Sequence, residues 1–218
     1  MSEIIVSFPA AHIAALKLFA GQADARSYLS GICLEIGPTE GRAIATDGSI
    51  LGVFRKAWTE PLDIAAPLRS INIPNALLAH VKAKGLDVEF AIGEPDKTYR
   101  YPVRVNFMGV SAGGFTTEGI YPDYRRVIPS RASGDFALLV PENVARLEKA
   151  RNLLFPGAKP KRLSAAVIPN GQGGALICLG EPDFTGVLMP YRLNAEGGFS
   201  KDAPAWVSDY LEAAESLV

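Results

Sequence analysis

A proline-marked repeat constrains this chain more than any other feature. Three segments share it, and they read IIVSFPAAHIAALK, RSINIPNALLAHVK and FALLVPENVARLEK. Their prolines lie 65 and 67 residues apart, and each is followed eight residues later by a lysine: Pro9, Pro74, Pro141 and Lys17, Lys82, Lys149. Proline cannot continue a strand ladder but suits the first helical turn, so it marks a switch from strand to helix. The chain is therefore predicted to be built from repeated units.

Each predicted helix is followed by runs of strand character. Glycine-rich turns separate these runs at residues 37–41, at Gly113-Gly114 and at the GQGG of residues 171–174. Short turns between such runs are typical of antiparallel hairpins. The predicted unit is therefore strand, helix and three strands, repeated three times, in an α+β fold with antiparallel sheets and the helices on one face.

One stretch is the best candidate for a domain boundary. Residues 120–134 read IYPDYRRVIPSRASG and hold two prolines, three arginines and a tail of small residues. We expect a domain of two units at 1–130 and a half domain of one unit at 131–193. A linker and a C-terminal helix are expected at 194–218.

Composition excludes several classes of protein. The 218 residues carry 22 Lys plus Arg against 23 Asp plus Glu, and 48% are hydrophobic, which argues against disorder. Cys33 and Cys178 lie far apart, so we expect small core residues in a reducing compartment and neither a disulfide framework nor a thiolate zinc site. The start of the chain does not resemble a signal peptide and no apolar run reaches membrane length, so a soluble cytoplasmic protein is expected.

No motif proposes a reaction. Asp47, in the sequence ATDG, is interpreted as a turn aspartate followed by a glycine with positive φ. The glycine clusters lack the lysine and Ser/Thr of a phosphate loop, and no metalloprotease or serine-hydrolase motif is present. We therefore expect no enzyme, no metal and no cofactor.

Basic residues concentrate near the third predicted helix. From Pro141 to Arg162 there are six basic residues against two acidic ones. One interpretation is a solvated helix face, and the other is sequence-independent contact with DNA phosphates, which needs only positive charge on a surface. The lysine at a matching position of every unit favours DNA contact, and the predicted DNA-binding residues are Lys17, Lys82, Lys84, Arg146, Lys149 and Arg151.

Four segments, in order, resemble a known family: YLSGICLEI, AIATDGSILGV, EGIYPDYRRVIP and VLMPYRL. The sequence is similar to the bacterial DNA polymerase III beta subunit, the sliding clamp, as far as Leu193. The resemblance implies a ring of repeated units, with helices lining a central channel and sheets outside. Clamp chains have three domains, and this chain resembles the middle domain and half of the last one, without an amino-terminal domain.

The resemblance also implies a peptide-binding pocket between the middle and last domains. By residue match its walls are Leu29, Thr46, Gly48, Leu51, Pro129, Val187, Met189, Pro190 and Tyr191. Aliphatic walls and an adaptable methionine suit short apolar peptide motifs. Without the resemblance, Leu29, Leu51, Val187 and Met189 would be interpreted as core. The family has His-Arg after TDG, where this chain has Ser49-Ile50.

Two functions follow as expectations. The first is a sliding-clamp-like processivity factor in DNA replication. It would encircle or contact duplex DNA without sequence preference and recruit a polymerase or other partners through the pocket. The alternative is an interaction or adaptor protein that keeps the pocket but does not encircle DNA.

The third unit raises a question of assembly. Alone, its sheet would expose unpaired edges and an apolar face. Either it pairs with the third unit of another chain across a two-fold axis, giving a homo-oligomer, or the C-terminal helix from Pro204 to Leu217 covers it. That helix has apolar residues at helical spacing, as a cover requires: Trp206, Val207, Tyr210, Leu211 and Ala214.

Overall fold

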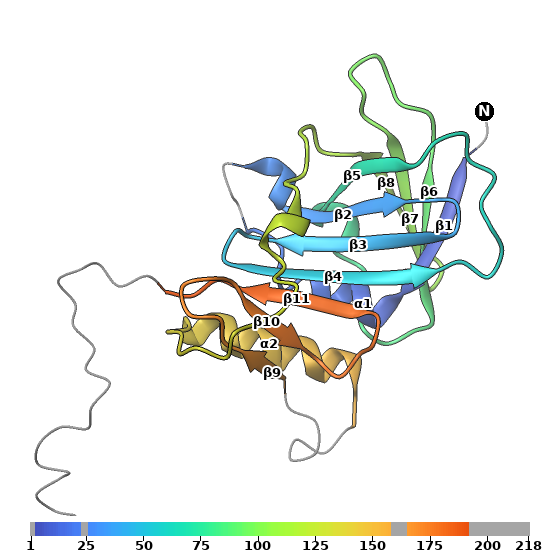
Figure 1. The fold of residues 1–218 in the computed structure, drawn as a ribbon. Helices are drawn as coiled ribbons and strands as arrows, with labels where there is room; N and C mark the ends of the chain where they lie inside the picture. The colour runs from blue at the N-terminus through green and yellow to red at the C-terminus, as the bar shows by residue number, and fades with distance from the viewer. Residues whose placement is uncertain (1–2, 23–25, 158–164, 192–218) are drawn as a thin grey trace, which may run out of the picture.

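The first unit forms as the repeat predicts. A computed structural model describes residues 3–22, 26–157 and 165–191 of the chain. A strand, a helix, a separate 3-10 turn and three further strands follow one another (Figure 1). Their bounds are β1 (Ile4–Pro9), α1 (Ala10–Leu16), η1 (Ser27–Leu29), β2 (Gly31–Ile36), β3 (Glu40–Thr46) and β4 (Ile50–Ala57).

The second and third units follow the same order, but the second has a 3-10 turn in place of the helix and the third has no first strand among the described residues. The second consists of β5 (Leu68–Pro74), η2 (Asn75–Leu78), β6 (Asp87–Ile92), β7 (Pro102–Phe107) and β8 (Val110–Phe115). A linker with the single turn η3 (Tyr124–Val127) leads to the third unit. This unit consists of α2 (Pro141–Leu154), β9 (Ala166–Ile168), β10 (Ala175–Cys178) and β11 (Phe184–Leu188).

The first two units exchange their first strands. One sheet has the order β1-β6-β7-β8 and the other the order β5-β2-β3-β4-β11-β10-β9, and all pairings are antiparallel. Thus β1 of the first unit belongs to the sheet of the second, and β5 of the second belongs to the sheet of the first. The two units share one core in an α+β fold, as the sequence predicts.

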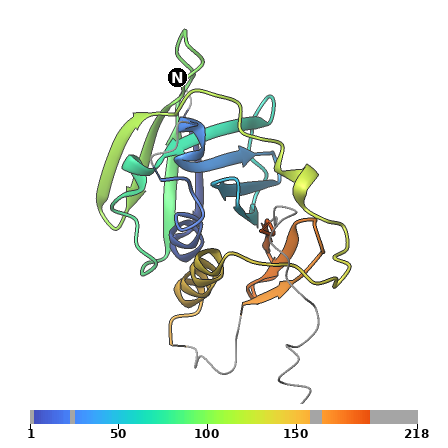
Figure 2. The same ribbon diagram turned by 90° about the vertical axis from the view of Figure 1, so that its left-hand side faces the viewer.

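The third unit extends the sheet of the first. Strand β11 pairs with β4 from Phe184 opposite Phe54 to Leu188 opposite Ile50. Beneath the sheet, α2 lies beside α1 (Figure 2). The third unit is therefore docked on the first, and among the described strands only the outer edge of β9 is left unpaired on its side of the sheet.

Two apolar clusters hold the fold together. The larger lies between the sheets and against the helices, and includes Phe8, Ile13 and Phe90. The smaller lies on the other face of the seven-stranded sheet and is covered by the linker. Its buried members are Leu29, Cys33, Ile44, Leu51, Val53, Tyr121, Tyr124 and Val187.

The prediction of a helix after Pro74 is wrong. Only the single 3-10 turn η2 forms there. The Lys17 ammonium donates hydrogen bonds to the carbonyl oxygens of Leu78 (2.7 Å) and Val81 (3.2 Å). The Leu78 oxygen also accepts the Val81 N–H (3.1 Å), so the Lys17 side chain of the first unit adds bonds to carbonyl oxygens at the end of the turn of the second.

The predicted first strand of the third unit also does not form. Residues 136–140 pair with no described strand, and their Leu138 carbonyl oxygen accepts a hydrogen bond from the Tyr191 N–H (2.7 Å). Strands β1 and β5 each pair with a strand of the other unit in their pair. The described residues contain no fourth unit that could pair with residues 136–140 in the same way.

Two smaller expectations need correction. The turn of the second unit lies at Met108-Gly109, where both residues have positive φ (49° and 80°), and not at Gly113-Gly114, which lie inside β8. Consecutive positive φ values give the tight turn favoured in two-residue hairpins. Cys33 is buried as expected, but Cys178 is exposed at the end of β10.

The predicted helix from Pro204 to Leu217 lies outside the described residues, as does Leu193. No helix in the described ranges has the length and apolar character needed to cross a membrane. The division into domains at residues 130 and 193 stays a prediction.

The exchange of strands predicts that position 31 tolerates only glycine without loss of stability. A Cβ atom there would lie 2.0 Å from the Ile73 carbonyl oxygen on the exchanged strand β5. We expect Gly31→Ala to lower the free energy of unfolding by about 1–3 kcal/mol, the usual cost of overpacking. Urea denaturation measures this. Gly113→Ala is the control, because its Cβ would meet no atom within 4 Å. Equal stabilities of the two variants would contradict the close approach of β5 to β2.

Candidate peptide-binding pocket and helix face

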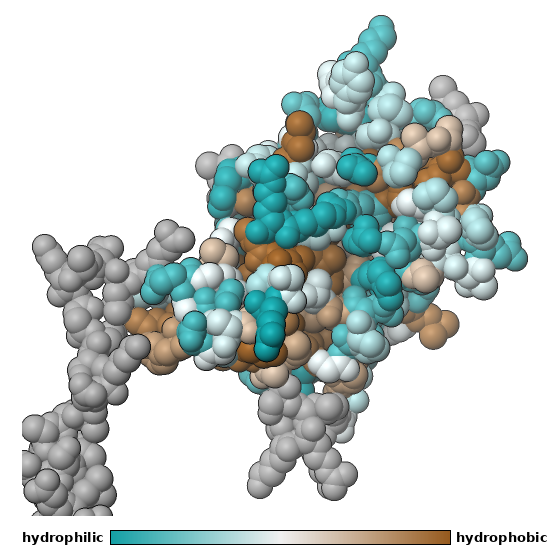
Figure 3. All heavy atoms as spheres, in the orientation of Figure 1, coloured by the Kyte–Doolittle hydropathy of each residue, from teal (hydrophilic) through white to brown (hydrophobic). Residues whose placement is uncertain are grey.

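An apolar cavity opens where the first unit, the third unit and the linker meet. Its volume is about 220 Å³. Leu51 of β4 and Val187 of β11 are register partners and lie next to Leu29, and these three side chains are at most 3% exposed. Figure 3 shows apolar side chains in brown among hydrophilic ones on this face of the sheet. The smaller apolar cluster is therefore also the floor of the cavity.

The turn between β3 and β4 forms one wall. We call residues 46–50 the pocket turn. The Thr46 hydroxyl donates to the Ile50 carbonyl oxygen (2.7 Å) and accepts from the Gly48 N–H (3.0 Å). Asp47 Oδ1 accepts from the N–H groups of Ser49 (2.8 Å) and Ile50 (3.1 Å). Gly48 has φ of +94°, a conformation that glycine adopts at little cost.

The linker forms the opposite wall and is fixed to the sheet by Glu35. The Tyr124 hydroxyl and the Arg125 guanidinium both donate to this carboxylate of β2, at 3.1 Å and 2.5 Å. Burial and the neighbouring Glu35 raise the pKa of Tyr124, so its hydroxyl stays a neutral donor. The side chains of Pro122, Tyr124 and Val127 then face the cavity.

The structure brings six of the nine predicted pocket residues together around this cavity: Leu29, Thr46, Gly48, Leu51, Val187 and Met189. The other three do not line it. Pro129 lies half-buried further along the linker, Pro190 is buried beyond β11, and Tyr191 is 57% exposed. The peptide-binding role of the whole set stays a prediction.

Sequence reasoning missed several lining residues. Pro122, Asp123, Tyr124 and Val127 belong to the motif PDYRRVIP, so that motif was the signal from which they could have been found. Ser49 and Ile50 also line the cavity, at the two positions where the sequence departs from the family pattern. Arg26 completes the rim, where its guanidinium donates to the Asp47 carbonyl oxygen (3.1 Å), and no motif pointed to it.

The four lysines predicted to bind DNA differ in exposure. Lys82, Lys84 and Lys149 are exposed. Lys17 is half-buried and bonded to η2, and its pKa is lowered by burial and by the nearby charge of Lys82. Lys159, Lys161 and Arg162, which contributed to the basic stretch, lie outside the described residues.

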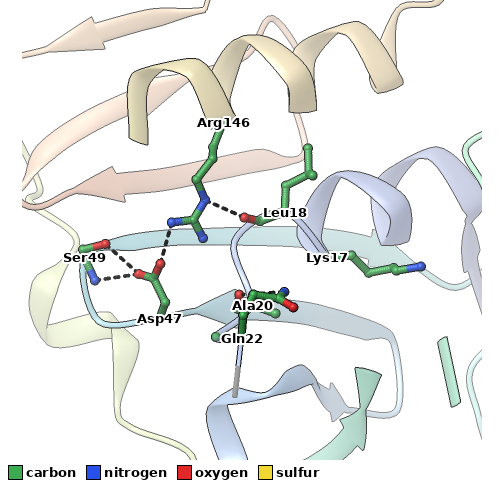
Figure 4. A pocket seen from close by; sticks show the side chains of 8 residues that line it. Lys17, Leu18, Ala20, Gln22, Asp47, Ser49 and Arg146 are labelled. Carbon is green, nitrogen blue, oxygen red and sulfur yellow. Dashed lines mark hydrogen bonds and ion pairs between the residues drawn. The ribbon is translucent and has the colours of Figure 1, made fainter. Parts of the chain in front are cut away.

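Two of the predicted DNA contacts require correction. The Arg151 side chain is only 1% exposed and donates to Asn152 Oδ1 (2.5 Å), so it does not reach the surface. Arg146 donates to Asp47 Oδ2 (2.5 Å) and to the Leu18 carbonyl oxygen (2.7 Å), as Figure 4 shows. Its guanidinium is therefore engaged within the protein and is not available as a free phosphate contact.

Among the described residues, the histidines and acidic side chains form no metal site. His12 stacks on Phe54, with 4.1 Å between ring centroids, and burial lowers its pKa. In the described ranges, no three His, Cys, Asp or Glu side chains gather in a way that would hold a metal ion.

Solved structures share this architecture. The chain aligns with the DNA polymerase sliding clamp of Pseudomonas aeruginosa at a TM-score of 0.57 and 17% identity, over 87% of this chain and 66% of the clamp chain. The fold is that of a DNA polymerase sliding clamp. The Bacillus subtilis clamp gives a TM-score of 0.59 at 15% identity over 88% and 65%, and Caulobacter crescentus pol III beta gives 0.56 at 19% over 88% and 66%.

The likeness lies in the structure. No protein-family model and no curated protein matches the sequence. The chain also spans only about two thirds of the length of the clamp chains with which it aligns. The comparison therefore shows the clamp fold of the described units.

The carboxylate of the pocket turn predicts a dependence on pH. Burial raises the pKa of Asp47, but hydrogen bonds from Arg146 and Ser49 outweigh it, so the pKa lies below its ordinary value of 3.8. The ionised group therefore stabilises the fold in full above that value and loses its effect as pH falls through the lower folded pKa.

We expect Asp47→Asn to be less stable than the natural chain near neutral pH, with a difference that shrinks below about pH 4. Urea denaturation of both proteins across a pH series measures it. A difference that stays constant through the acid range would contradict the assigned role of the Asp47 charge.

Proposed function

We propose that the chain is a clamp-like DNA-associated protein that recruits partners through a peptide pocket. The observation that carries this proposal is the apolar cavity at the junction of the first and third units, within a sliding-clamp fold. The proposed partners are duplex DNA, contacted without sequence preference, and a polymerase or other protein bearing a short apolar motif. No chemical step is proposed, and the setting would be DNA replication in the cytoplasm.

The cavity has the properties that a short peptide motif requires. Its floor is aliphatic, so an inserted apolar side chain would exchange water for apolar contact. Met189 lies half-buried against the floor, and its flexible thioether can adapt to different side chains. The volume is below the roughly 300–1,000 Å³ of typical small-molecule sites, so it suits the anchoring side chains of a peptide.

Polar groups at the rim would orient the peptide. Ser49 and Asp123 line the cavity beside the apolar floor. The Asp123 carboxylate can accept from peptide N–H groups, whereas the Ser49 hydroxyl already donates to Asp47 Oδ1 (2.7 Å) and accepts from Asn143. Directional bonds at the rim, together with apolar anchors at the floor, are the usual division of roles in such sites.

DNA contact would come from the lysines that remain exposed. Lys82 and Lys84 follow η2, and Lys149 lies on the side of α2 away from its buried residues Leu147 and Ala150. Point charges on a surface bind phosphates weakly and in a salt-dependent manner, which permits sliding. A homo-oligomer that completes a ring is part of this proposal.

The adaptor alternative is favoured by one specific observation. Of the six predicted DNA contacts, Arg146 is bonded to Asp47 and Arg151 is buried. The described surface therefore offers fewer cations to DNA than the sequence predicts. Light-scattering mass followed by retention on nicked circular DNA separates the two functions. A clamp is retained until the circle is linearised, whereas an adaptor is not retained.

The pocket predicts the effect of truncating its methionine. We expect Met189→Ala to weaken binding of a short synthetic peptide, with a glutamine followed by spaced leucine and phenylalanine, by on the order of 1 kcal/mol or more. The reason is loss of a half-buried anchor at the cavity wall. Isothermal titration calorimetry measures the affinity.

Met108→Ala is the matched control, because Met108 is 74% exposed at the β7–β8 hairpin and lines none of the cavities described here. Its affinity should equal that of the natural chain. A folded Met189→Ala variant with undiminished affinity would refute the pocket.

The lysines predict a uniform loss of DNA association. Reversing Lys82 and Lys149 to glutamate should weaken binding about equally for unrelated duplexes, and more at low salt than at high salt. Fluorescence anisotropy at several salt concentrations measures this. Arg126→Glu, on the exposed linker, serves as a charge-reversal control. The proposal fails if the double variant binds DNA at low salt as well as the control does.

A further inference from the structure

A single arginine of the third unit reaches the pocket turn of the first. Arg146 of α2 binds Asp47 Oδ2 through Nη1 and the Leu18 carbonyl oxygen through Nε. Its neighbour Asn143 accepts from the same Nη1 (3.0 Å) and donates to the Ser49 hydroxyl (3.2 Å). Three segments that are distant in sequence, α2, the end of α1 and the pocket turn, thus meet in one bonded network.

The pocket turn is a thin wall between two hollows. On one side Thr46, Gly48 and Ser49 line the apolar cavity. On the other side Asp47 and Ser49 face an open hollow that Arg146 also lines (Figure 4). Displacement of Arg146 in the open hollow would therefore move the residues of the pocket turn that line the apolar cavity.

The network is buried enough to constrain the turn. The side chains of Arg146 and Asp47 are 24% and 21% exposed. Removing one member of such a partly buried pair leaves the other charge without its partner, which is costlier than losing an exposed ion pair. Asp47 also accepts the N–H groups of Ser49 and Ile50, so a displaced carboxylate would release the turn itself.

We propose that Arg146 is a positioning residue: it holds the pocket turn in its binding shape and couples occupancy of the pocket to the docking of α2. The inference rests on the proposed peptide site, because the coupled ligand is the peptide. Coupling is reciprocal, so a peptide that favours the ordered turn also favours docked α2, and the reverse.

The test compares two arginine-to-methionine substitutions. Arg146→Met keeps an apolar stem but removes the guanidinium donors, whereas Arg131→Met removes an exposed charge of the linker that lines neither hollow. Arg146→Lys keeps the charge without the planar fork and serves if the methionine variant does not fold. Two quantities are measured: affinity for the glutamine-leucine-phenylalanine peptide, and hydrogen exchange of the Ser49 and Ile50 amides.

We expect Arg146→Met to weaken peptide binding roughly five- to tenfold, at the lower end of common coupling strengths. Exchange at Ser49 and Ile50 should accelerate in the same variant without peptide. Peptide should slow exchange of the α2 amides in the natural chain and slow it less in the variant. Arg146→Lys should give the same changes to a smaller extent, and Arg131→Met should behave as the natural chain in both measurements.

Unchanged affinity and unchanged exchange at Ser49 and Ile50 in folded Arg146→Met would overturn the inference. So would an equal effect of Arg131→Met, which would indicate loss of charge in general. A natural chain that binds no peptide would refute the proposed function. The exchange rates of Ser49 and Ile50 would then still decide whether Arg146 positions the turn.

Discussion

The pairing of β11 with β4 is the constraint on which the rest of the structure depends. It joins the third unit to the first, brings Val187 opposite Leu51 and places Met189 beside the pocket turn, where its N–H bonds to the Ser49 carbonyl oxygen (2.8 Å). The same pairing carries α2 to the side of α1. Without it the floor of the cavity would come from one unit only, and Met189 would not lie beside the pocket turn.

Much of this architecture could be predicted from the sequence, because its signals are local. Pro9 and Pro74 each end a strand and Pro141 begins a helix, and these positions follow from the physics of proline without tertiary context. Glycine with positive φ after Asp47 likewise follows from the tight β3–β4 connection. The family resemblance then supplied what local rules do not, namely that Leu29, Leu51 and Val187 meet.

What could not be predicted depends on contacts between distant segments. The buried residues of α2 include, besides Leu147 and Ala150, the polar Asn143 and Arg151. A polar residue that satisfies its hydrogen bonds inside a protein leaves no mark in a hydropathy pattern. Arg146 is engaged in such bonds, whereas Arg151 is buried although its Nε and Nη2 find no hydrogen-bond partner among the described residues. A longer helix after Pro74 does not form, and Lys17, a full unit away, donates to the Leu78 and Val81 carbonyl oxygens there.

The most direct test of the account follows the methyl groups of the protein by NMR during titration with the glutamine-leucine-phenylalanine peptide. The account predicts that signals of Leu29, Leu51, Val187 and Met189 shift together with one dissociation constant. Signals of Leu86 and Met108, exposed elsewhere, should stay in place. Saturable binding that shifts Leu86 or Met108 and leaves the four pocket residues unmoved would contradict it.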